Sequence, residues 1–565
     1  MKNKSVIVTM LLIMFVVLGC KIPKEFLGDL KADPNPMELK GGKITVNVEG
    51  TFPAKYFNKN MVLTVVPVLK SKTTGATLRG EPKVFQGEKV KGNNKTINFK
   101  QGGKYEQTAV FDYDPQFDQS ELYMEATAQI KKKSITFEPV KVADGLITTA
   151  NLLYNNPSEI GSKIIPDQFQ KTIEQKEQAE IKFLIQQSDI RNSEMKNLVN
   201  LTNNIKNAKI DSNIVIKELN ISSYASPDGG IELNEKLAGA RENSTKKYVD
   251  AQIKKLKTQL DISANFTAQD WEGFKTLMES SNIQDKAVIL NVLSMYSDPE
   301  QREKEIKNLS SAYTEIKESI LPKLRRSKLT LTKEIVGKSD EQIAELLAKD
   351  PAQLSVEEML YAATVNPNFE YKKRVYQKVI QYFPNDPRGY NNLGVIEYQL
   401  GNIDAANRNF TKALEIDKNN AVANFNKGSV LLAQGNVKDA ETYLGNAGGV
   451  GNELNLTNGA VAIAKGDYKK AVSLYGNSNT NNAALAKILN KDYSGARNVL
   501  ENIQTPDAKT YYLQSIVAAR TNDTKELIKA ATNTLNTDNS YKTKFLNDPE
   551  FAAFINDAAF SALFQ

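Results

Sequence analysis

Histidine is absent from this 565-residue sequence, and cysteine occurs once, at position 20. Without histidine the chain cannot form a Ser-His-Asp triad, a Cys-His dyad or a zinc site with a histidine ligand. A single cysteine also excludes an intramolecular disulfide, so each domain must be stabilised by its own hydrophobic core. Any catalysis would therefore have to use carboxylate, lysine or tyrosine side chains.

Long apolar runs are also missing after the N-terminus. Residues 6–18 form an apolar stretch that follows the basic residues Lys2 and Lys4. This stretch is shorter than the ~20 residues that a membrane-spanning helix needs, and it has the layout of an export signal. We therefore expect residues 1–19 to be removed on export and the rest of the chain not to span a membrane.

The apolar stretch ends in VLGC at residues 17–20, which resembles the lipobox of bacterial lipoproteins. The resemblance implies that Cys20 is lipidated, with palmitate among the attached acyl groups, and that residues 20–35 form a linker. A plain export signal with an incidental cysteine is the alternative. Lys21 stands where Asp would signal inner-membrane retention, so the resemblance favours the outer membrane. Because no acidic cluster lies nearby, it also favours the periplasmic face.

The charges are nearly balanced, with 73 Lys and Arg against 66 Asp and Glu, a formal net charge of +7. Proteins that bind nucleic acid usually concentrate a larger basic excess on one face. Together with the export signal, this balance argues against a nucleic-acid partner.

Apolar and polar residues alternate between residues 36 and 148, as in half-buried β-strands. Glycine pairs such as Gly41-Gly42 and Gly102-Gly103 interrupt the alternation at turn-like points. The pattern predicts about seven strands in an immunoglobulin-like β-sandwich. We find no candidate site in this region.

Strand-like and helix-like patterns then alternate between residues 150 and 345. Ile181 and Phe183 have strand spacing, residues 195–205 have helix spacing, and Ile214 and Ile216 again have strand spacing. A β-α-β-α-β order predicts an α/β domain, in which a mixed sheet has helices packed on one face.

One loop-helix segment suggests a family for this domain. Residues 221–229 (ISSYASPDG) precede Asn234, Leu237 and Arg241, which share one face of the predicted helix. The pattern resembles the OmpA-like family, whose signature is a strand, an Asp- and Gly-bearing loop, and N-x-x-L-x-x-x-R. The later segment Leu324-Arg325-Arg326 resembles that family's closing strand. Residues 267–322 would then be a helical insertion, which the minimal family domain lacks.

In the OmpA-like family the domain binds peptidoglycan, and the arginine at the position of Arg241 pairs with a carboxylate of the peptide stem. The resemblance thus implies a peptidoglycan site formed by Asp228, Asn234 and Arg241. A guanidinium beside a helix N-terminus is suited to bind a carboxylate with two hydrogen bonds. The sequence departs from the family at Ser226, where the family has its aspartate.

This departure leaves two interpretations open. In one, Asp228 replaces the missing aspartate and contacts the ammonium end of the peptide stem. In the other, the fold is kept without its ligand, Asn234 caps the loop, and Arg241 pairs with Glu235 or Glu242.

The third region repeats itself at an offset of 34 residues (428 − 394). The first copy contains Gly394, Gly401, Ala406, Phe410 and Ala413, and the second contains Gly428, Gly435, Ala440, Leu444 and Ala447. This period resembles the tetratricopeptide repeat, in which two antiparallel helices form each unit. We expect an all-α solenoid over residues 355–535, and capping helices over residues 536–565, where four phenylalanines recur with helical spacing.

The resemblance to tetratricopeptide repeats implies a groove lined by the first helix of each pair. The positions expected to be exposed in this groove are Asn391, Tyr398, Phe425, Ser429, Leu456 and Ala460. Grooves of this kind hold an extended peptide or a partner helix. The alternative is that these side chains pack against an adjacent domain or the C-terminal segment.

The whole arrangement resembles Bacteroidetes-type outer-membrane lipoproteins that combine OmpA-like and tetratricopeptide modules. It implies a non-enzymatic periplasmic scaffold that is tethered to peptidoglycan and binds a protein partner, without a cofactor or metal. The second hypothesis is an assembly or secretion factor that does not bind peptidoglycan. An enzyme would need a carboxylate pair such as Asp228 with Glu232 or Asp270 with Glu272, and such loop pairs are usually solvated.

Overall fold

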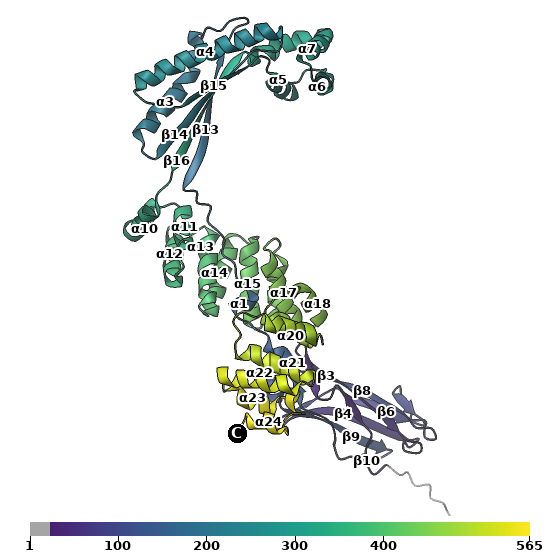
Figure 1. Ribbon diagram of the computed structural model, residues 1–565. Coiled ribbons are helices and arrows are strands. Elements are labelled where there is room, and N and C mark those ends of the chain that lie inside the picture. The colour runs from purple at the N-terminus through teal and green to yellow at the C-terminus, as the bar shows by residue number, and fades with distance from the viewer. Residues whose placement is uncertain (1–22) are drawn as a thin grey trace, which may run out of the picture. The chain divides into compact units, whose positions relative to one another are not determined.

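The structure is a computed structural model that describes residues 23–565. Cys20 and the export signal lie outside the described residues. The chain divides into two compact units, Met1–Pro166 with Asn366–Gln565 (unit 1) and Asp167–Val365 (unit 2). Within the described range, none of the helices combines the length and the apolar character needed to cross a bilayer. The chain is multidomain, with a β-rich N-terminal part and a helical C-terminal part (Figure 1).

Unit 1 begins with two β-sheets packed on a common core. One sheet contains β1 (Lys31–Asp33), β2 (Met37–Lys40), β3 (Lys43–Phe52), β8 (Gly103–Asp112) and β12 (Leu146–Ile147). The other contains β4 (Met61–Ser71), β5 (Thr77–Arg79), β6 (Lys83–Gly87), β7 (Lys95–Ile97), β9 (Ser120–Ile130), β10 (Lys133–Thr136) and β11 (Val140–Asp144). The alternating residues Ile44, Val46 and Val48 are fully buried between the sheets.

The β-rich part has more strands than the sequence predicted, and it begins at Lys31, before residue 36. Most of the unexpected strands have two to five residues. Strands of that length contain too few alternations to be recognised from the sequence. The immunoglobulin-like assignment stays a prediction.

Helices fill the C-terminal part of unit 1. They are α12 (Phe369–Tyr382), α13 (Pro387–Gln399), α14 (Ile403–Ile416), α15 (Ala421–Ala433), α16 (Val437–Gly445), α17 (Asn452–Ala464), α18 (Tyr468–Tyr475), α19 (Asn481–Leu489), α20 (Tyr493–Glu501), α21 (Ala508–Arg520) and α22 (Thr524–Thr537). A short cap follows, with α23 (Tyr541–Asn547), η4 (Pro549–Phe551) and α24 (Ala558–Ala562). The cap buries Phe545, Phe551 and Phe560 in the core of the last repeats.

The repeated glycines explain how the helices of a pair pack closely. A Cβ atom on Gly394 would lie 2.6 Å from the Phe410 ring, and one on Gly428 would lie 2.6 Å from Leu444. A side chain at either position would therefore overlap with the second helix of the pair. This close approach recurs with the 34-residue period of the sequence.

Residues 149–166, here called the strap, connect β12 to unit 2 and contain η2 (Thr149–Leu152) and α1 (Pro157–Ile160). The predicted α/β domain began at residue 150, but the strap packs on the repeats of unit 1. The predicted boundary at residue 150 is wrong. The strap has no apolar periodicity that would indicate that it packs on the repeats. The β-rich part also contacts the repeats directly: the Tyr468 hydroxyl donates to the Leu39 carbonyl at 3.5 Å.

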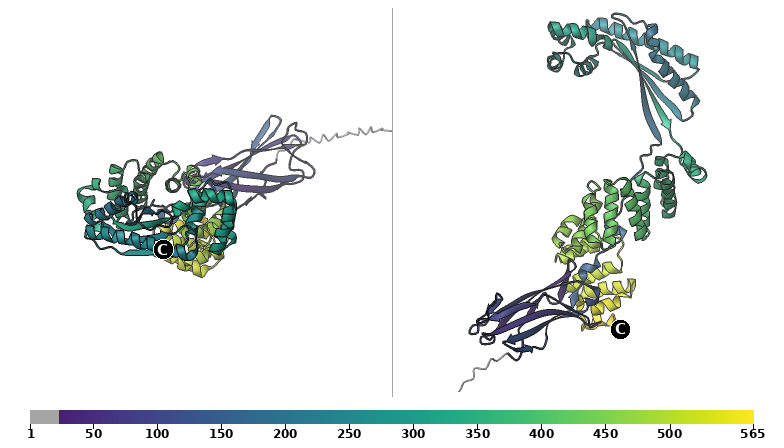
Figure 2. Two further views of the ribbon diagram at one scale, coloured as in Figure 1. Left: turned by 90° about the horizontal axis from the view of Figure 1, so that it is seen from above. Right: turned by 180° about the vertical axis from the view of Figure 1, so that it is seen from behind.

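Unit 2 has a four-stranded mixed sheet in the order β13 (Thr172–Lys182), β16 (Arg326–Val336), β14 (Ile214–Tyr224) and β15 (Ile262–Thr267). Strands β14 and β15 are parallel, and the other pairs are antiparallel. Helices α3 (Asn197–Ile210) and α4 (Ile231–Leu256) pack on the sheet through Leu201, Val249 and their neighbours. Figures 1 and 2 show the long helix α4 beside the sheet.

Five further helices lie between β15 and β16, at the place of the expected insertion. They are α5 (Trp271–Glu279), α6 (Lys286–Met295), α7 (Pro299–Asn308), α8 (Ser310–Ser319) and α9 (Leu321–Leu324). Phe274, Ile289 and Leu324 belong to a separate core that these helices share. Unit 2 ends with α10 (Asp340–Lys349) and α11 (Val356–Thr364), so the helix expected to open the repeats belongs to this unit.

Candidate binding face and loop site

Three asparagines, on α13, α15 and α19, bind the main chain of the strap. Asn392 on α13 accepts a hydrogen bond from the Ile165 amide and donates one to the Ile165 carbonyl, both at 2.9 Å. Asn426 on α15 does the same for Lys163, at 2.8 and 2.7 Å. Asn482 on α19 binds the amide and carbonyl of Tyr154 at 2.8 and 3.0 Å.

The geometry of these contacts is independent of the strap sequence. All three asparagines are at most 1% exposed, so their amide groups need partners within the protein. Each side-chain amide offers one donor and one acceptor to the two main-chain groups of a single residue. The face of α13, α15, α17, α19 and α21 that contacts the strap is here called the strap face, and it binds the main chain of the strap.

Side chains of the strap add specific contacts. Ile160 is fully buried in a cluster with Phe425, and Ile164 packs against the cluster that contains Tyr398. The Glu159 carboxylate accepts hydrogen bonds from the first amides of α19, at Asn481 (2.8 Å) and Asn482 (3.0 Å). A carboxylate at this place also interacts favourably with the helix dipole.

The far end of the strap is held by polar side chains of the last repeats and the cap. The Tyr154 hydroxyl donates to Asp507 at 2.6 Å. Burial raises the pKa of Asp507, but hydrogen bonds from Tyr154 and Thr510 outweigh it and leave the pKa below its usual value. Thr149 donates to Glu550 at 2.5 Å, and Arg520 binds the same carboxylate.

The predicted groove residues lie on the strap face or close to it, but they are not exposed. Asn391 is fully buried and donates to the Lys163 carbonyl at 3.2 Å. The other fully buried positions are Tyr398, Phe425, Ser429 and Ala460, while Leu456 is partly buried against the core of the last repeats. The expected exposure is wrong because the strap and neighbouring helices cover these positions. The roles of Asn392, Asn426 and Asn482 were not predicted, although asparagine pairs near the starts of first helices were a visible signal.

A second polar cluster surrounds the loop between β14 and α4 in unit 2. The Arg241 guanidinium is fully buried and donates to three main-chain carbonyls, those of Gln187 (3.0 Å), Tyr224 (2.9 Å) and Leu184 (3.2 Å). It also lies over the Phe183 ring at 5.2 Å. Burial and the nearby Arg325 lower the pKa of Arg241 to about 10. Arg241 therefore binds the loop after β13 rather than Glu235 or Glu242.

Asp228 and Asn234 hold the loop between β14 and α4 closed. Asp228 forms an ion pair with Arg325 at 3.1 Å and accepts a hydrogen bond from Ser226. Asn234 donates to the carbonyls of Ser226 (3.2 Å) and Gly229 (2.9 Å). The loop-capping role that the sequence suggested for Asn234 is thus present. Arg325 was seen only as the start of a strand, and its pairing with Asp228 was missed.

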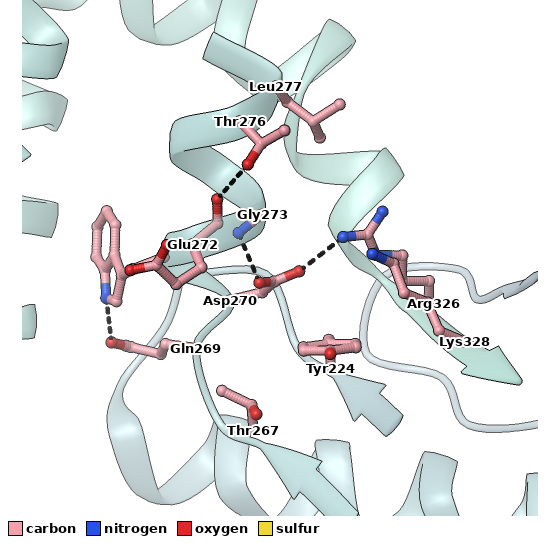
Figure 3. Close-up of a pocket in the computed structure, with 11 residues that line it drawn as sticks. Tyr224, Thr267, Gln269, Asp270, Glu272, Gly273, Thr276, Leu277, Arg326 and Lys328 are labelled. Atoms are coloured by element: carbon pink, nitrogen blue, oxygen red, sulfur yellow. Dashed lines mark hydrogen bonds and ion pairs between the residues drawn. The ribbon is translucent and has the colours of Figure 1, made fainter. Parts of the chain in front are cut away.

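A cavity of about 480 Å³ lies beside Tyr224, Asp270, Trp271 and Arg326 in unit 2 (Figure 3). The Arg326 guanidinium lies over the Tyr224 ring and pairs with Asp270 at 3.1 Å. The other Asp270 oxygen accepts from the Gly273 amide at 2.8 Å, at the start of α5. Asp270 is therefore engaged in holding the cavity wall and is not free for acid–base chemistry with Glu272. Among residues 23–565, no three or more carboxylate, histidine or cysteine side chains are grouped so that they could hold a metal ion.

Comparison with known proteins identifies the helical part. Residues 398–448 match the tetratricopeptide repeat family. No curated protein matches the sequence. A tetratricopeptide repeat protein from Parabacteroides merdae is 12% identical over 40% of this chain and 89% of that chain, with a TM-score of 0.29. PilF of Pseudomonas aeruginosa is 16% identical over 40% of this chain and 98% of that chain, with a TM-score of 0.27. PilW, a type IV pilus biogenesis factor, is 14% identical over 38% of this chain and all of that chain, with a TM-score of 0.28. The helical part of the chain contains tetratricopeptide repeats.

Proposed function

We propose that this chain is a non-enzymatic outer-membrane lipoprotein that acts as a periplasmic scaffold. Cys20 attaches it to the membrane through a lipid, and the tetratricopeptide repeats bind a protein partner. Unit 2 acts as an OmpA-like domain that tethers the chain to peptidoglycan through Asp228, Asn234 and Arg241.

The strap face is the observation that carries the scaffold role. Its buried asparagines lie on three first helices, α13, α15 and α19, and each binds both main-chain groups of one strap residue. This is how a repeat surface holds extended polypeptide without requiring one sequence. The contacts are made within the chain, so the repeats have the chemistry of peptide binding before any partner is present.

The charge balance of the loop supports the peptidoglycan tether. Two guanidinium groups, Arg241 and Arg325, lie near one carboxylate, Asp228. The cluster therefore has an excess positive charge at the loop that leads into helix α4. An anionic group such as the carboxylate of a peptide stem would be stabilised there.

The burial of Arg241 favours a second candidate function, an outer-membrane assembly or secretion factor that does not bind peptidoglycan. Arg241 is fully buried, and three carbonyls already accept its hydrogen bonds. A ligand carboxylate could reach it only if the loop after β13 moved. In this alternative the loop cluster serves to hold unit 2 together.

Co-sedimentation of the full mature chain with purified cell-wall sacculi separates the two functions. For the tether we expect the wild type to pellet and Asp228→Asn to lose at least ten-fold in affinity, because the variant removes the carboxylate that would contact the ammonium end of the peptide stem. The matched control is Asp261→Asn, an exposed carboxyl just before β15. A wild type that stays in the supernatant would reject the tether and leave the assembly or secretion role.

A further inference from the structure

The loops at one end of the β-rich part carry an excess of positive charge. These loops are residues 53–60, 88–94 and 98–102, together with the turn at residues 131–132. They contain a single acidic residue, Glu88. The exposed lysines of these segments, here called the lysine end, are Lys55, Lys89, Lys91, Lys100, Lys131 and Lys132.

Backbone contacts hold these segments side by side. The Lys55 amide donates to the Phe99 carbonyl at 2.6 Å, and the Lys89 amide donates to the Lys59 carbonyl at 2.8 Å. The turn at residues 131–132 follows β9, whose last residue pairs with the first residue of β4, directly after the first loop. Lysines from four separate segments of the chain therefore gather at one end of the two sheets.

The charges of the lysine end are not neutralised by the protein. Within residues 23–565, none of its six lysines forms an ion pair with a carboxylate. Glu88 accepts hydrogen bonds from the Asn98 side chain at 2.8 Å and from the Phe99 amide at 3.2 Å, so its carboxylate holds a neighbouring loop. All six lysines lie in turns or loops rather than on a strand, so protection of a strand edge does not account for them. A cluster of this kind produces a positive potential that attracts an anionic surface.

The N-terminal segment enters the β-rich part at the lysine end. The Tyr56 hydroxyl, next to Lys55 in the first loop, donates to the Glu25 carbonyl at 2.9 Å. Phe26 follows and is buried in the core between the sheets. Cys20 precedes Glu25 by five residues (25 − 20), and five residues span at most ~18 Å even when fully extended. A lipid on Cys20 would therefore place the membrane surface beside the lysine end.

The repeats contact the opposite end of the same sheets. A Cβ atom on Gly41, in the turn between β2 and β3, would lie 2.7 Å from the Lys465 carbonyl oxygen of the repeats. Strand β3 starts at Lys43, just after this turn, and ends at Phe52, just before the first loop of the lysine end. Its ten residues span about 33 Å, so the repeats leave the lysine end uncovered.

We propose that the lysine end is a second membrane contact, which binds the headgroups of anionic phospholipids beside the lipid on Cys20. A lipid alone attaches the chain but leaves the β-rich part free to rotate. Each lysine near an anionic membrane surface strengthens binding by about five-fold, so contact through the lysine end orients the sheets with their repeat-bearing end away from the membrane. This inference rests on the proposed lipid attachment and adds a protein surface that recognises the membrane by itself.

Co-sedimentation with lipid vesicles tests the lysine end in the absence of the lipid anchor. The full mature chain with Cys20→Ser is mixed with vesicles of phosphatidylglycerol and phosphatidylcholine in equal parts, or of phosphatidylcholine alone. We expect at least ten-fold tighter binding to the anionic vesicles. This preference should disappear as the salt concentration rises from about 0.05 M to about 0.3 M, because salt screens exposed charges.

Substitution of the lysines tests which surface makes the contact. The triple variant Lys55→Gln/Lys91→Gln/Lys132→Gln removes one charge from each of three segments and should bind the anionic vesicles at least ten-fold more weakly. Arginine at the same three positions restores the charges and should restore the binding. Circular dichroism should show the secondary structure of the wild type, since all three side chains are exposed.

A matched variant separates the position of the charges from their number. Lys438→Gln/Lys469→Gln/Lys470→Gln removes three exposed charges from the repeats, and it should bind the anionic vesicles within two-fold of the parent chain. An equal loss of affinity in both triple variants would show that net charge alone drives binding, and it would overturn the proposed contact.

Two other results would also overturn the membrane contact. One is equal binding of the parent chain to anionic and neutral vesicles. The other is saturable binding of tripolyphosphate at micromolar concentration, measured by calorimetry and lost in the lysine-end variant, which would assign these lysines to a soluble anion. We expect no saturable binding of tripolyphosphate below roughly 1 mM, because exposed charges on separate loops contribute little to binding one small anion.

Failure of the proposed function gives a different result. If mass spectrometry of the protein from cells found no lipid on Cys20, the anchor would be rejected. Binding of the Cys20→Ser chain to vesicles does not depend on that lipid, so the vesicle experiment judges the lysine end independently.

Discussion

The strap face and the loop of unit 2 both use buried polar side chains to hold irregular main chain, but with different chemistry. On the strap face, neutral asparagines each offer one donor and one acceptor to a single residue. In unit 2, the charged Arg241 offers only donors and binds three separate carbonyls. Amide pairs can be remade with any other extended segment. A buried guanidinium that loses its carbonyls would be left as an unsatisfied charge.

The strap face is better suited to an exchange of ligands than the Arg241 cluster. A neutral amide pair contributes modestly when made, and another ligand restores it in full. During such an exchange the polar group is without its hydrogen-bond partners for a time. For a buried charge this state costs more free energy than it does for a neutral amide. We therefore expect the strap face to be the adaptable surface and the Arg241 cluster to be a fixed structural element, unless an anionic ligand enters.

Substitution of Arg241 should have the largest effect. Arg241→Met keeps an unbranched apolar stem but removes three hydrogen bonds to main-chain carbonyls, so we expect the free energy of unfolding of unit 2 to fall by about 3–5 kcal/mol. Trp271 is the single tryptophan of the chain and lies in unit 2, so urea unfolding followed by tryptophan fluorescence reports this unit. The control Lys246→Ala removes a half-exposed ion pair with Asp250 on α4 and should change the free energy of unfolding by ~1 kcal/mol or less. A similarly small effect for Arg241→Met would show that the Arg241 cluster is not a fixed structural element, and the two regions would not differ in this respect.

Asn426→Asp places a charge on the strap face, which is otherwise bound by neutral asparagines. We expect its effect on the free energy of unfolding to be intermediate. The carboxylate keeps the shape of the asparagine but cannot donate to the Lys163 carbonyl or to the Asn391 side chain. It also places a charge at a fully buried position, so we expect unit 1 to lose about 2–4 kcal/mol. Far-UV circular dichroism measures this loss, while the Trp271 transition of unit 2 should not move. The control Asn419→Asp lies in an exposed turn and should be nearly neutral.

The sequence predicted the parts of this structure that depend on periodicity. The 34-residue repeat places Gly394 and Gly428 where a Cβ atom would overlap with the second helix of the pair. This need for glycine is visible in the sequence as a glycine that recurs with the period of the repeat. Alternation in the β-rich part similarly indicated the buried side of β3 and β9. It was wrong for β4, where the alternation was placed on Val62, Thr64 and Val66 but apolar residues occupy both sides and Met61, Leu63 and Val65 are the buried ones. Short strands such as β12 do not have enough residues to show either pattern.

Contacts between distant segments could not be predicted in this way. The strap is separated from Asn426 by more than 200 residues, and an asparagine that binds main chain does not constrain the sequence of its partner. Arg241 was recognised from its spacing to Asn234, but its carbonyl partners lie in a loop without a motif. The interpretation of a motif as a ligand site or as a structural clamp thus depends on neighbours that the motif does not contain.

The smallest expected effect concerns pH and the carboxyl of Asp507, which binds Tyr154 of the strap and caps α21. Hydrogen bonds from Tyr154 and Thr510 keep the pKa of Asp507 below its usual value despite partial burial. A carboxyl with a lowered folded-state pKa contributes stability that is fully present above its unfolded pKa of about 4 and is lost as pH falls through the folded value. Asp507→Asn keeps the acceptor for Tyr154 but does not titrate. The melting temperature of unit 1 should therefore fall less steeply between about pH 5 and pH 3 in this variant than in the wild type. Asp404→Asn, an exposed carboxyl on α14, is the control and should follow the wild type. Parallel curves for Asp507→Asn and the wild type would show that the charge of Asp507 does not stabilise unit 1, and the strap would then be held by its asparagine pairs and apolar anchors without it.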